Sequence, residues 1–494
     1  MPETVHDAVI VGAGFGGIGA AIQLHRLGLH DLLILERESD LGGTWHVNRY
    51  PGLAVDIPSS TYSYSFEPNP YWSRLYAPGA ELKQYAAHVA HKYDVRRHMR
   101  FDTVVEGAVW DEDRSHWSVG IAGGERVHAR LLLTATGFLS QPRLPDIEGI
   151  ESFAGAVVHT TQWDDDLDLD GRRAAVIGTG ATAVQLIPEI APRLAALTVF
   201  QRTAIWVTPK QDGAVPRWLQ RLYARVPLTQ RLVRTVGSGI LEAIMVSGVL
   251  RYRRAKALNR GVEKLALRHL RRQVDDPATR EQLTPDYSFG CKRPTFSNTY
   301  FPTFNRPHVR LETTPIARIE PDAIVTTDGG RTEIDTLVLA TGFNLWDTNF
   351  PAFEVIGRGG VDLGKFWREG RFQAYEGVAV PGFPNFISLN SPYSYSGLSY
   401  FTTIESQMLH MDRLLSEVTR RGATTFEVTE RANTAFLDRM TANLTDSVFV
   451  QGSCATSRSY YFNQHGEATL LRPTSTLNAF REARSFPLED YVYA

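Results

Sequence analysis

The sequence predicts an α/β protein with two parallel sheets, each opening on a glycine-rich turn, and a separate helical insertion. A short apolar strand followed by a glycine-rich turn and a helix occurs twice, at residues 7–27 and 173–190. Each unit is followed further along the chain by an apolar run that ends in Ala-Thr-Gly. Because strands that alternate with helices pack into parallel sheets, this order predicts two such domains.

Length and charge narrow the class of protein. The chain has 494 residues, is 43% hydrophobic and carries a formal charge of -2. It is long enough for two or three packed domains. Its charges nearly balance and no long basic run occurs, so we expect no nucleic acid partner and take a small molecule as the substrate. Nothing in the sequence predicts an oligomeric state.

The cysteines and the N-terminus point to a cytoplasmic compartment. Cys291 and Cys454 are too few for a disulfide framework or a cysteine-based metal site, so we expect no metal and a reducing environment. The polar start leads straight into a strand without a signal peptide. The most apolar stretch, residues 236–250, is shorter than the ~20 residues of a membrane span. We interpret it as a buried helix, with docking to a membrane surface as the less favoured interpretation and no stable insertion.

The first glycine turn has the pattern of a dinucleotide site. Residues 7–11 (DAVIV) are typical of a buried parallel strand and lead into GAGFGG at residues 12–17. Gly12 permits the tight turn, Gly14 lets the backbone approach a pyrophosphate, and Gly17 lets the helix pack on the strand. The next strand, residues 32–35, ends at Glu36, whose carboxylate can accept a hydrogen bond from a ribose hydroxyl. This Rossmann-like unit suits FAD or NAD.

The second glycine turn differs from the first in one informative position. A strand at residues 173–177 leads into GTGATA, in which Gly178, Gly180 and, after Thr182, Ala183 take the fingerprint positions. The following strand, residues 197–200, ends in Gln-Arg rather than in glutamate. A carboxylate there would repel a 2'-phosphate, whereas Arg202 can bind it, so the second unit suits NADP. A solvated surface arginine is the alternative interpretation of Arg202.

The Ala-Thr-Gly strings suggest that one domain is inserted in another. The first string, at residues 135–137, precedes the second glycine turn, and the other, at residues 340–342, follows it. We therefore predict an FAD-binding domain at residues 1–147 and 335–494 and an NADP-binding domain at residues 148–209 and 290–334. Residues 210–289 lack a glycine fingerprint and read as amphipathic helices with arginines outward, which predicts a helical insertion.

Two further motifs make the sequence similar to a known family. Residues 153–164 (FAGAVVHTTQWD) fit the string F-x-G-x-x-x-H-x-x-x-W-P/D, and residues 42–56 (GGTWHVNRYPGLAVD) fit G-G-x-W-x-x-x-x-Y-P-G-x-x-x-D. With the paired glycine turns, these strings resemble type I Baeyer-Villiger monooxygenases of the class B flavoprotein monooxygenases, over essentially the whole chain. The fixed positions of the first string are Phe153, Gly155, His159, Trp163 and Asp164.

The resemblance implies roles for individual residues. Residues 290–294 (GCKRP), with aromatic residues shortly after them, resemble the family segment with the active-site arginine, which implies a catalytic Arg293 and a Lys292 that binds the NADP 2'-phosphate. Asp56 becomes its carboxylate partner, with a turn-capping role as the alternative. For His159 a structural or hinge role is at least as plausible as catalysis. The remaining residues expected at the cofactors are Gly43, Thr44, Trp45 and Tyr62.

The reaction that the resemblance implies explains why the site requires an arginine. The resemblance implies an enzyme that uses FAD, NADPH and O2 to convert a ketone into an ester or lactone through a C4a-peroxyflavin, whose anion attacks the carbonyl. A permanently charged guanidinium stabilises that anion and the oxyanion that follows. The alternatives are N- or S-oxygenation on the same scaffold and, less favoured, a flavin reductase without oxygenation. Asn344 stands where the family often has Asp, which leaves one cofactor contact open.

Overall fold

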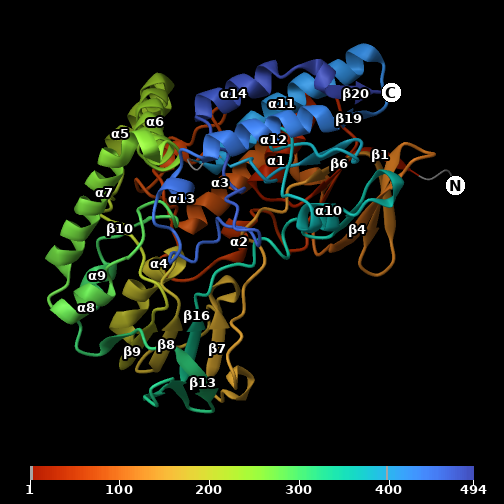
Figure 1. Cartoon of the computed structure of the whole chain (residues 1–494). Helices are drawn as coiled ribbons and strands as arrows, with labels where there is room; N and C mark the ends of the chain where they lie inside the picture. Colours follow the sequence, from red (N-terminus) through yellow and green to blue (C-terminus); the bar gives the residue numbers. More distant parts are fainter. Residues whose placement is uncertain (1–3, 396–398) are drawn as a thin grey trace.

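The computed structural model describes residues 4–395 and 399–494, which form two sheet-containing parts and a column of helices (Figure 1). In Figure 1 the part with β1, β4 and β6 lies above the part with β7, β8, β9 and β16, and the column of α5, α6 and α7 runs along the left edge. The predicted α/β class with a helical insertion is confirmed.

The first part is built on an eight-stranded sheet with the order β17-β4-β5-β6-β1-β2-β3, in which β18 also pairs with β6. The run at residues 7–11 lies in its centre, where Val9 pairs with Leu33 on one side and with Leu132 on the other, all in parallel. The strands are β1 (Val5–Val11), β2 (Leu32–Leu35), β3 (Met99–Arg100), β4 (Val105–Asp111), β5 (His116–Ile121), β6 (Arg126–Thr134), β17 (Glu354–Ile356) and β18 (Phe386–Ser388).

The second part is built on a five-stranded parallel sheet with the order β12-β9-β8-β16-β7. Its strands are β7 (Ala156–His159), β8 (Arg173–Ile177), β9 (Ala196–Phe200), β12 (Val309–Glu312) and β16 (Thr336–Leu339). The predicted boundary at residue 335 is therefore too early, because β16 pairs with β7 and β8 and the chain leaves this sheet only after Leu339.

The chain crosses between the two parts at one place. Pro142, on the way into the second sheet, forms a bridge with Phe343, on the way out. Beside it the Arg143 amide donates to the Gly342 carbonyl at 2.9 Å, and the Asn344 amide donates to the Gln141 carbonyl at 2.9 Å. The entry and the exit of the inserted part thus lie next to each other.

Helices cover both sheets, and short strands complete the structure. Helix α11 packs on α1 and contributes buried residues such as Phe401 and Met411 to the core of the first part. The helices outside the insertion are α1 (Phe15–Arg26), α2 (Thr44–Val47), α3 (Gly79–Lys92), α4 (Ala181–Ile190), α9 (Tyr300–Thr303), α10 (Leu363–Glu369), α11 (Tyr400–Arg421), α12 (Glu430–Leu444), α13 (Val448–Gln451) and α14 (Thr476–Ser485). The short strands are β10 (Val207–Thr208), β11 (Thr295–Phe296), β13 (Ile316–Glu320), β14 (Ala323–Thr326), β15 (Arg331–Glu333), β19 (Phe426–Val428) and β20 (Tyr491–Tyr493). The 3-10 turns are η1 (Ser59–Thr61), η2 (Arg96–His98), η3 (Ile150–Ser152), η4 (Thr160–Gln162), η5 (Ala191–Arg193), η7 (Arg358–Gly360) and η8 (Leu488–Asp490).

The predicted helical insertion comprises α5 (Arg217–Arg225), α6 (Pro227–Leu241), the π-helix η6 (Glu242–Leu250), α7 (Tyr252–Gln273) and α8 (Pro277–Gln282). The expectation that residues 236–250 form a buried helix is correct only for the second half of that stretch. Val246, Val249 and Leu250 are buried, whereas Val236 and Ile240 are more than half exposed. By length and composition the 24-residue stretch Pro227–Leu250, which contains an 18-residue window with a mean hydropathy of 1.4, could cross a membrane.

The two glycine turns are built alike, and the Ala-Thr-Gly strings explain why. Gly12 has a φ of +109°, and a Cβ atom there would lie 2.5 Å from the Ala135 carbonyl oxygen. Gly178 has a φ of +114°, and its Cβ would lie 2.4 Å from the Ala340 carbonyl oxygen. Both the positive φ and the crossing strand end exclude a side chain.

We expect Gly12→Ala to destabilise the first part more than positive φ alone would. Gly123 has a φ of +94° with open space around its Cβ position, so Gly123→Ala measures backbone strain of about 1–3 kcal/mol without a clash. Gly12→Ala adds the collision with Ala135, worth roughly 1–3 kcal/mol more, and should also lower the FAD content of the purified protein. Thermal unfolding and bound-flavin absorbance of the two variants measure both effects. Equal losses in the two variants would show that the close approach does not matter.

Candidate active site

A cavity of about 400 Å³ lies between the two parts. Its walls come from the first glycine turn, from the loop at residues 42–57 and from residues 135–141, and it reaches Thr182 and Gln185 on α4 of the second part. The predicted site residues that line it are Gly12, Gly14, Glu36, Gly43, Thr44, Trp45, Asp56, Tyr62, Thr182 and Arg293. The structure thus brings the proposed catalytic pair and both predicted dinucleotide turns to one cavity.

The N-terminus of α1 is shaped for the phosphates of a dinucleotide. Its N-cap is Gly14, which has no side chain to bond the first free N–H groups of the helix, and the first turn contains no acidic residue. A Cβ on Gly14 would point at the Gly43 Cα at 3.6 Å, so a side chain there would fill the space between the turn and the loop. Free N–H groups and the helix dipole attract anions. The cradle fits the pyrophosphate of FAD.

Glu36 lies beside this cradle with its carboxylate at the cavity. Its Oε2 accepts a hydrogen bond from the Ala13 amide at 2.7 Å, and its Oε1 accepts one from the Glu38 amide at 3.1 Å. Burial raises the pKa of Glu36, and the two amides only partly oppose that shift. A buried carboxylate with further lone pairs facing a cavity suits a donor such as a ribose hydroxyl.

The loop at residues 42–56 joins the two parts. Tyr50 donates a hydrogen bond to Oε1 of Gln185 on α4 at 3.0 Å, and Nε2 of Gln185 donates to the Ala54 carbonyl at 2.9 Å. Gly52 packs so closely on α4 that a Cβ would lie 2.7 Å from the Gln185 carbonyl oxygen. The Tyr-Pro-Gly string is therefore a contact between the dinucleotide-binding parts. At its start, Trp45 Nε1 donates to the Tyr62 hydroxyl at 3.2 Å on the cavity wall.

Asp56 and Arg293 form an ion pair at the cavity although they are 237 residues apart. Arg293 Nε donates to Asp56 Oδ2 at 2.7 Å, and Nη1 donates to the Tyr395 hydroxyl at 2.9 Å. Burial, the largest single effect, would raise the pKa of Asp56, but the charge and the hydrogen bond of Arg293 with smaller contributions together hold that pKa below its ordinary value. Burial is also the largest single effect on Arg293 and would lower its pKa, but the charge and hydrogen bond of Asp56, together with Tyr395 and Tyr461, raise it. Both groups are charged. Tyr461 also interacts with the guanidinium, whose five N–H groups are not all taken by Asp56 and Tyr395.

A group of basic side chains gathers near the second glycine turn. Burial and the charge of Arg202 lower the pKa of Lys292 to about 8. The pKa of Arg202 is itself lowered by burial and by the charges of Arg458 and Arg143. Gly180 is the N-cap of α4 and, like Gly14, leaves the first N–H groups of its helix free. Cations that repel one another beside a helix N-terminus suit a ligand with several negative charges, such as NADP.

Several predicted residues lie away from the cavity wall. Three of them are turn residues that do not face the cavity, namely Gly17, Gly178 and Ala183. Three others are Gly180, which belongs to the second turn, and Arg202 and Lys292, which belong to the basic group near it. All of the fixed residues of the 153–164 string, namely Phe153, Gly155, His159, Trp163 and Asp164, also lie outside the cavity lining.

The 153–164 string has a structural basis. A Cβ on Gly155 would lie 2.2 Å from the Asp335 carbonyl oxygen, beside the edge strand β7. His159 ends β7 opposite Leu339 of β16, and its Nδ1 accepts a hydrogen bond from the Thr161 amide at 3.2 Å. Burial lowers the pKa of His159 and favours the neutral ring. The structural or hinge role of His159 stays a prediction, and the residue lies at the exit toward residues 340–343.

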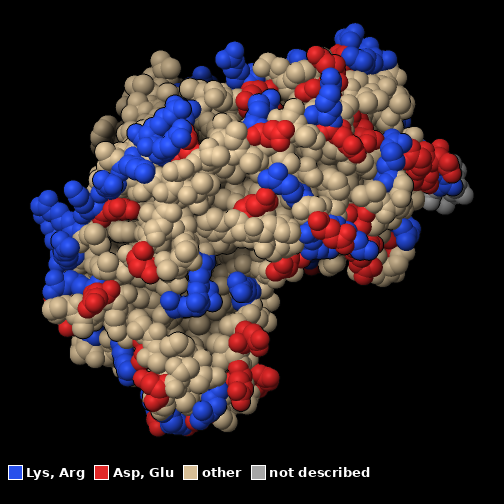
Figure 2. All heavy atoms as spheres, viewed as in Figure 1, with Lys and Arg blue, Asp and Glu red and all other residues tan. Residues whose placement is uncertain are grey.

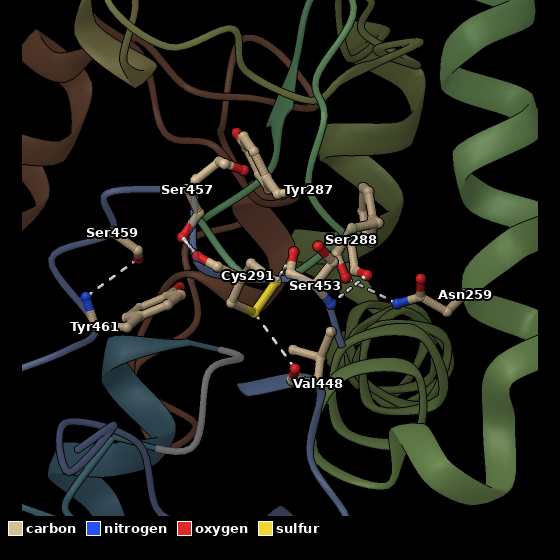
Figure 3. The surroundings of a disulfide bond; sticks show 12 residues. Asn259, Tyr287, Ser288, Cys291, Val448, Ser453, Ser457, Ser459 and Tyr461 are labelled. Carbon is tan, nitrogen blue, oxygen red and sulfur yellow. Dashed lines mark hydrogen bonds between the residues drawn. A yellow bond between two sulfur atoms is a disulfide. The ribbon is translucent and has the colours of Figure 1, made fainter. Parts of the chain in front are cut away.

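The cysteines form a disulfide, which the sequence analysis did not expect. Figure 3 shows the bond from Cys291 to Cys454, between the segment that contains Ser288 and the C-terminal segment that contains Ser453. The Ser288 amide also donates to the Ser453 carbonyl at 3.0 Å. Cys291 directly precedes Lys292 and Arg293, so the bond anchors the segment that carries both cations. The cysteine count therefore no longer supports a reducing compartment.

Sequence reasoning missed Gln185, Tyr400 and Arg143. Gln185 and Tyr400 line the cavity, and the charge of Arg143 acts on Arg202. The spacing of Gln185, four residues after Ala181 on a predicted helix, was the one signal that could have found it. Among the described residues, no group of three or more His, Cys, Asp or Glu side chains is placed to hold a metal ion.

Comparisons with known proteins agree with this arrangement. The model of the pyridine nucleotide-disulphide oxidoreductase family matches residues 9–229. A Baeyer-Villiger monooxygenase of Streptomyces coelicolor is 37% identical to this chain, over 99% of the chain and 93% of the relative. Another, of Pseudomonas aeruginosa, is 38% identical over 92% of the chain and 85% of the relative.

A solved structure extends the likeness to the fold. The complex of OTEMO with FAD and NADP superposes with a TM-score of 0.88 at 29% identity and covers 100% of both chains. The chain belongs to the Baeyer-Villiger monooxygenases, flavoproteins that use FAD, NADPH and O2 to convert a ketone into an ester or lactone.

Proposed function

We propose that Arg293 is the catalytic cation of this chain, that Asp56 positions it, and that the substrate is a small hydrophobic ketone. The observation that carries the proposal is the ion pair between Arg293 and Asp56 at a cavity to which both glycine turns contribute. Tyr395, Tyr400 and Phe343 make part of the wall apolar and aromatic, which favours a hydrophobic substrate. We further propose a cytoplasmic location, where NADPH is supplied.

We assign FAD to the first part and NADPH to the second. Residues 1–147 and those after β16 would hold FAD through the Gly12 turn and Glu36, and the second sheet with Lys292 and Arg202 would hold NADPH. When bound, NADPH supplies the hydride and FAD the activation of O2. Thr44, Trp45 and Tyr62 would close the FAD side of the cavity, and Thr182 would face the phosphates at the start of α4.

In this proposal Arg293 stabilises negative charge where the oxygen atom is inserted. Nε is committed to Asp56 and Nη1 to Tyr395, which fixes the plane of the guanidinium. Its other N–H groups can then bind the carbonyl oxygen of a ketone as that oxygen becomes negative. The pKa of Arg293 is raised, so the group does not serve as an acid and cannot protonate the nucleophile.

Asp56 acts through Arg293. A lone guanidinium in this partly buried site would be costly to desolvate, and Asp56 balances its charge. The side chains of Asp56 and Arg293 are 32% and 19% exposed, so solvent screens the pair only in part. The alternative role of Asp56 as a turn cap does not account for its bond to a side chain of the other part.

The basic group predicts a preference for NADPH that depends on pH. Lys292→Ala or Arg202→Ala should raise the Kd for NADP+ by roughly tenfold to hundredfold, since each removes a charge-assisted contact worth about 1.5–3 kcal/mol. With a pKa of about 8, Lys292 loses its proton as the pH rises through that value, so the wild-type Kd should rise above pH 8. Lys292→Arg stays charged and should flatten this rise. Titrations of the oxidised protein with NADP+ at several pH values measure it.

Arg172→Ala, which removes an exposed arginine just before β8, is the matched control and should leave the Kd unchanged. If the wild type used NADH as well as NADPH, the assignment of the second part to NADP would be wrong.

Asp56→Ala should slow flavin reduction more than it weakens FAD binding. The change leaves the charge of Arg293 unpaired and lets its side chain move, whereas Asp56→Asn keeps an acceptor and should lose less. Stopped-flow reduction by NADPH and the FAD content of each variant separate the two effects. Asp212→Ala breaks another ion pair, with the exposed Arg74 at 3.1 Å, and serves as the control. Reduction at the wild-type rate in Asp56→Ala would leave this residue only a turn cap.

Arg293→Ala should lower ester formation by roughly 10²-fold to 10³-fold, the usual effect of losing one oxyanion donor. FAD and NADPH binding should remain. Sulfide oxygenation needs no oxyanion at a carbonyl and should survive better. Product analysis with a ketone and a sulfide in parallel distinguishes these reactions, and Arg293→Lys tests whether charge without the planar fork is enough. Ester formation near the wild-type rate in Arg293→Ala would overturn the role proposed for this residue.

A further inference from the structure

An apolar surface on α5 and α6 lies outside everything described above. It is made of large side chains that face solvent on both helices, and we name it the α5–α6 ridge. The exposed fraction is 65% for Trp218, 72% for Leu228 and 64% for Leu232. The full ridge consists of Trp218, Leu222, Val226, Leu228, Leu232, Val233, Val236 and Ile240. An exposed apolar surface of this kind marks a site of interaction with another protein, a membrane or a ligand.

The exposed apolar side chains of the ridge lie on one face of each helix and are not scattered around it. On α6, residues 228, 232, 236 and 240 follow one another at intervals of four, which puts them on one side of the helix. The other side of α6 is fixed to the protein. Gln230 Nε2 donates to the Asn69 carbonyl at 2.6 Å, and Arg234 Nη1 donates to the Ser63 carbonyl at 2.7 Å. The helix is anchored by its polar face and presents its apolar face outward.

The charge around the ridge is of one sign. Residues 213–241 contain five arginines and no lysine, aspartate or glutamate. Arg217, Arg221, Arg225 and Arg231 are exposed, and none of the ion pairs found among the described residues involves them. Figure 2 shows basic side chains gathered along the left edge of the molecule, where α5, α6 and α7 lie. An apolar surface flanked by arginines is complementary to an anionic, amphipathic partner.

We propose that the α5–α6 ridge docks the protein on the surface of a lipid bilayer that contains anionic lipids. Apolar side chains on one face of a helix and arginines beside them are the features by which helices lie in the interface of a bilayer. The arginines can extend toward the headgroups while the ridge enters the acyl boundary. A second copy of the chain would bring arginines against arginines, which disfavours a symmetric dimer through this face.

The same helices do not span the bilayer. The apolar stretch Pro227–Leu250 includes Arg231, Arg234 and Glu242, and its last residues are buried in the protein. Docking therefore buries only the outward face. Helix α6 packs against η1, and the residue after η1 is Tyr62, which lines the cavity. The docked helix is therefore adjacent to the loop that forms part of the active-site wall.

The test uses the holoprotein and vesicles of phosphatidylcholine with and without phosphatidylglycerol. We expect flotation with the vesicles that contain phosphatidylglycerol, weakened by high salt because exposed charges are screened. Replacing Arg217, Arg221 and Arg225 together by Gln should weaken binding by on the order of hundredfold, from about 1 kcal/mol for each arginine. The triple variant Leu228→Gln, Leu232→Gln, Val236→Gln should abolish binding.

Matched controls come from α14, on which Leu477 is 80% exposed. Leu477→Gln and the pair Arg481→Gln, Arg484→Gln should bind vesicles as the wild type does, and NADPH oxidation without vesicles should be the same in all variants. Three results would overturn the proposal. The first is no binding of the wild type to anionic vesicles, and the second is binding that the ridge variants leave unchanged. The third is a wild-type dimer, detected by light scattering, that dissociates in the triple variant of Leu228, Leu232 and Val236.

Discussion

The ion pair between Arg293 and Asp56 is the interaction on which the site depends. Asp56 comes from a loop of the first part, and Arg293 comes from the segment that leads into β11 beside the second. Breaking one side of a fully buried pair costs about 3–5 kcal/mol, much of it from the charge left unpaired, and this partly exposed pair contributes less because solvent screens it in part. The two parts are therefore held in the arrangement that brings both glycine turns to one cavity. A cation at that point balances negative charge without acting as an acid.

Other contacts at the same boundary support the pair from both sides. Gln185 bonds Tyr50 and Ala54, so α4 cannot shift without moving the loop that carries Asp56. The disulfide anchors the segment before Arg293 to the C-terminal segment that contains Arg458 and Tyr460. Together these contacts explain how side chains from four distant stretches of sequence meet at one place. The basic group near α4 and the glycine cradle at the N-terminus of α1 are two different sites. Two such sites suit two dinucleotides of different charge.

Local sequence signals predicted most of what is local in the structure. The strand predicted at residues 173–177 is β8, and both glycine turns lie where their spacing puts them, because strand, turn and helix are set by neighbouring residues. The roles of Arg293 and Asp56 came from family resemblance, since nothing in their spacing brings residues 237 positions apart together. The boundary at residue 335 failed because strand order, which puts β16 between β7 and β8, is a long-range property.

The difference between local and long-range properties also explains the other predictions that were wrong. Residues 236–241 are apolar, and apolar helices are usually buried, but the polar anchors of α6 face inward and turn the apolar side out. The disulfide could not be predicted because it requires the proximity of residues 163 positions apart. Gln185 and Arg143 act on partners in another part of the chain. Helical spacing could point to Gln185 as a residue at the second turn, but nothing in a single sequence identifies the partners of either residue.

The single crossing point between the two parts has a consequence for how such a protein can change. Pro142 and Phe343 lie opposite each other, so the inserted part begins and ends at adjacent positions on its host. A segment with neighbouring ends can be exchanged as a unit by recombination at two junctions, without threading the chain anew through the first sheet. The NADPH specificity that we propose for the second part could thus be inherited, or engineered, separately from the flavin site proposed for the first. The exchange would have to preserve the contacts that cross the boundary, because they align the two halves.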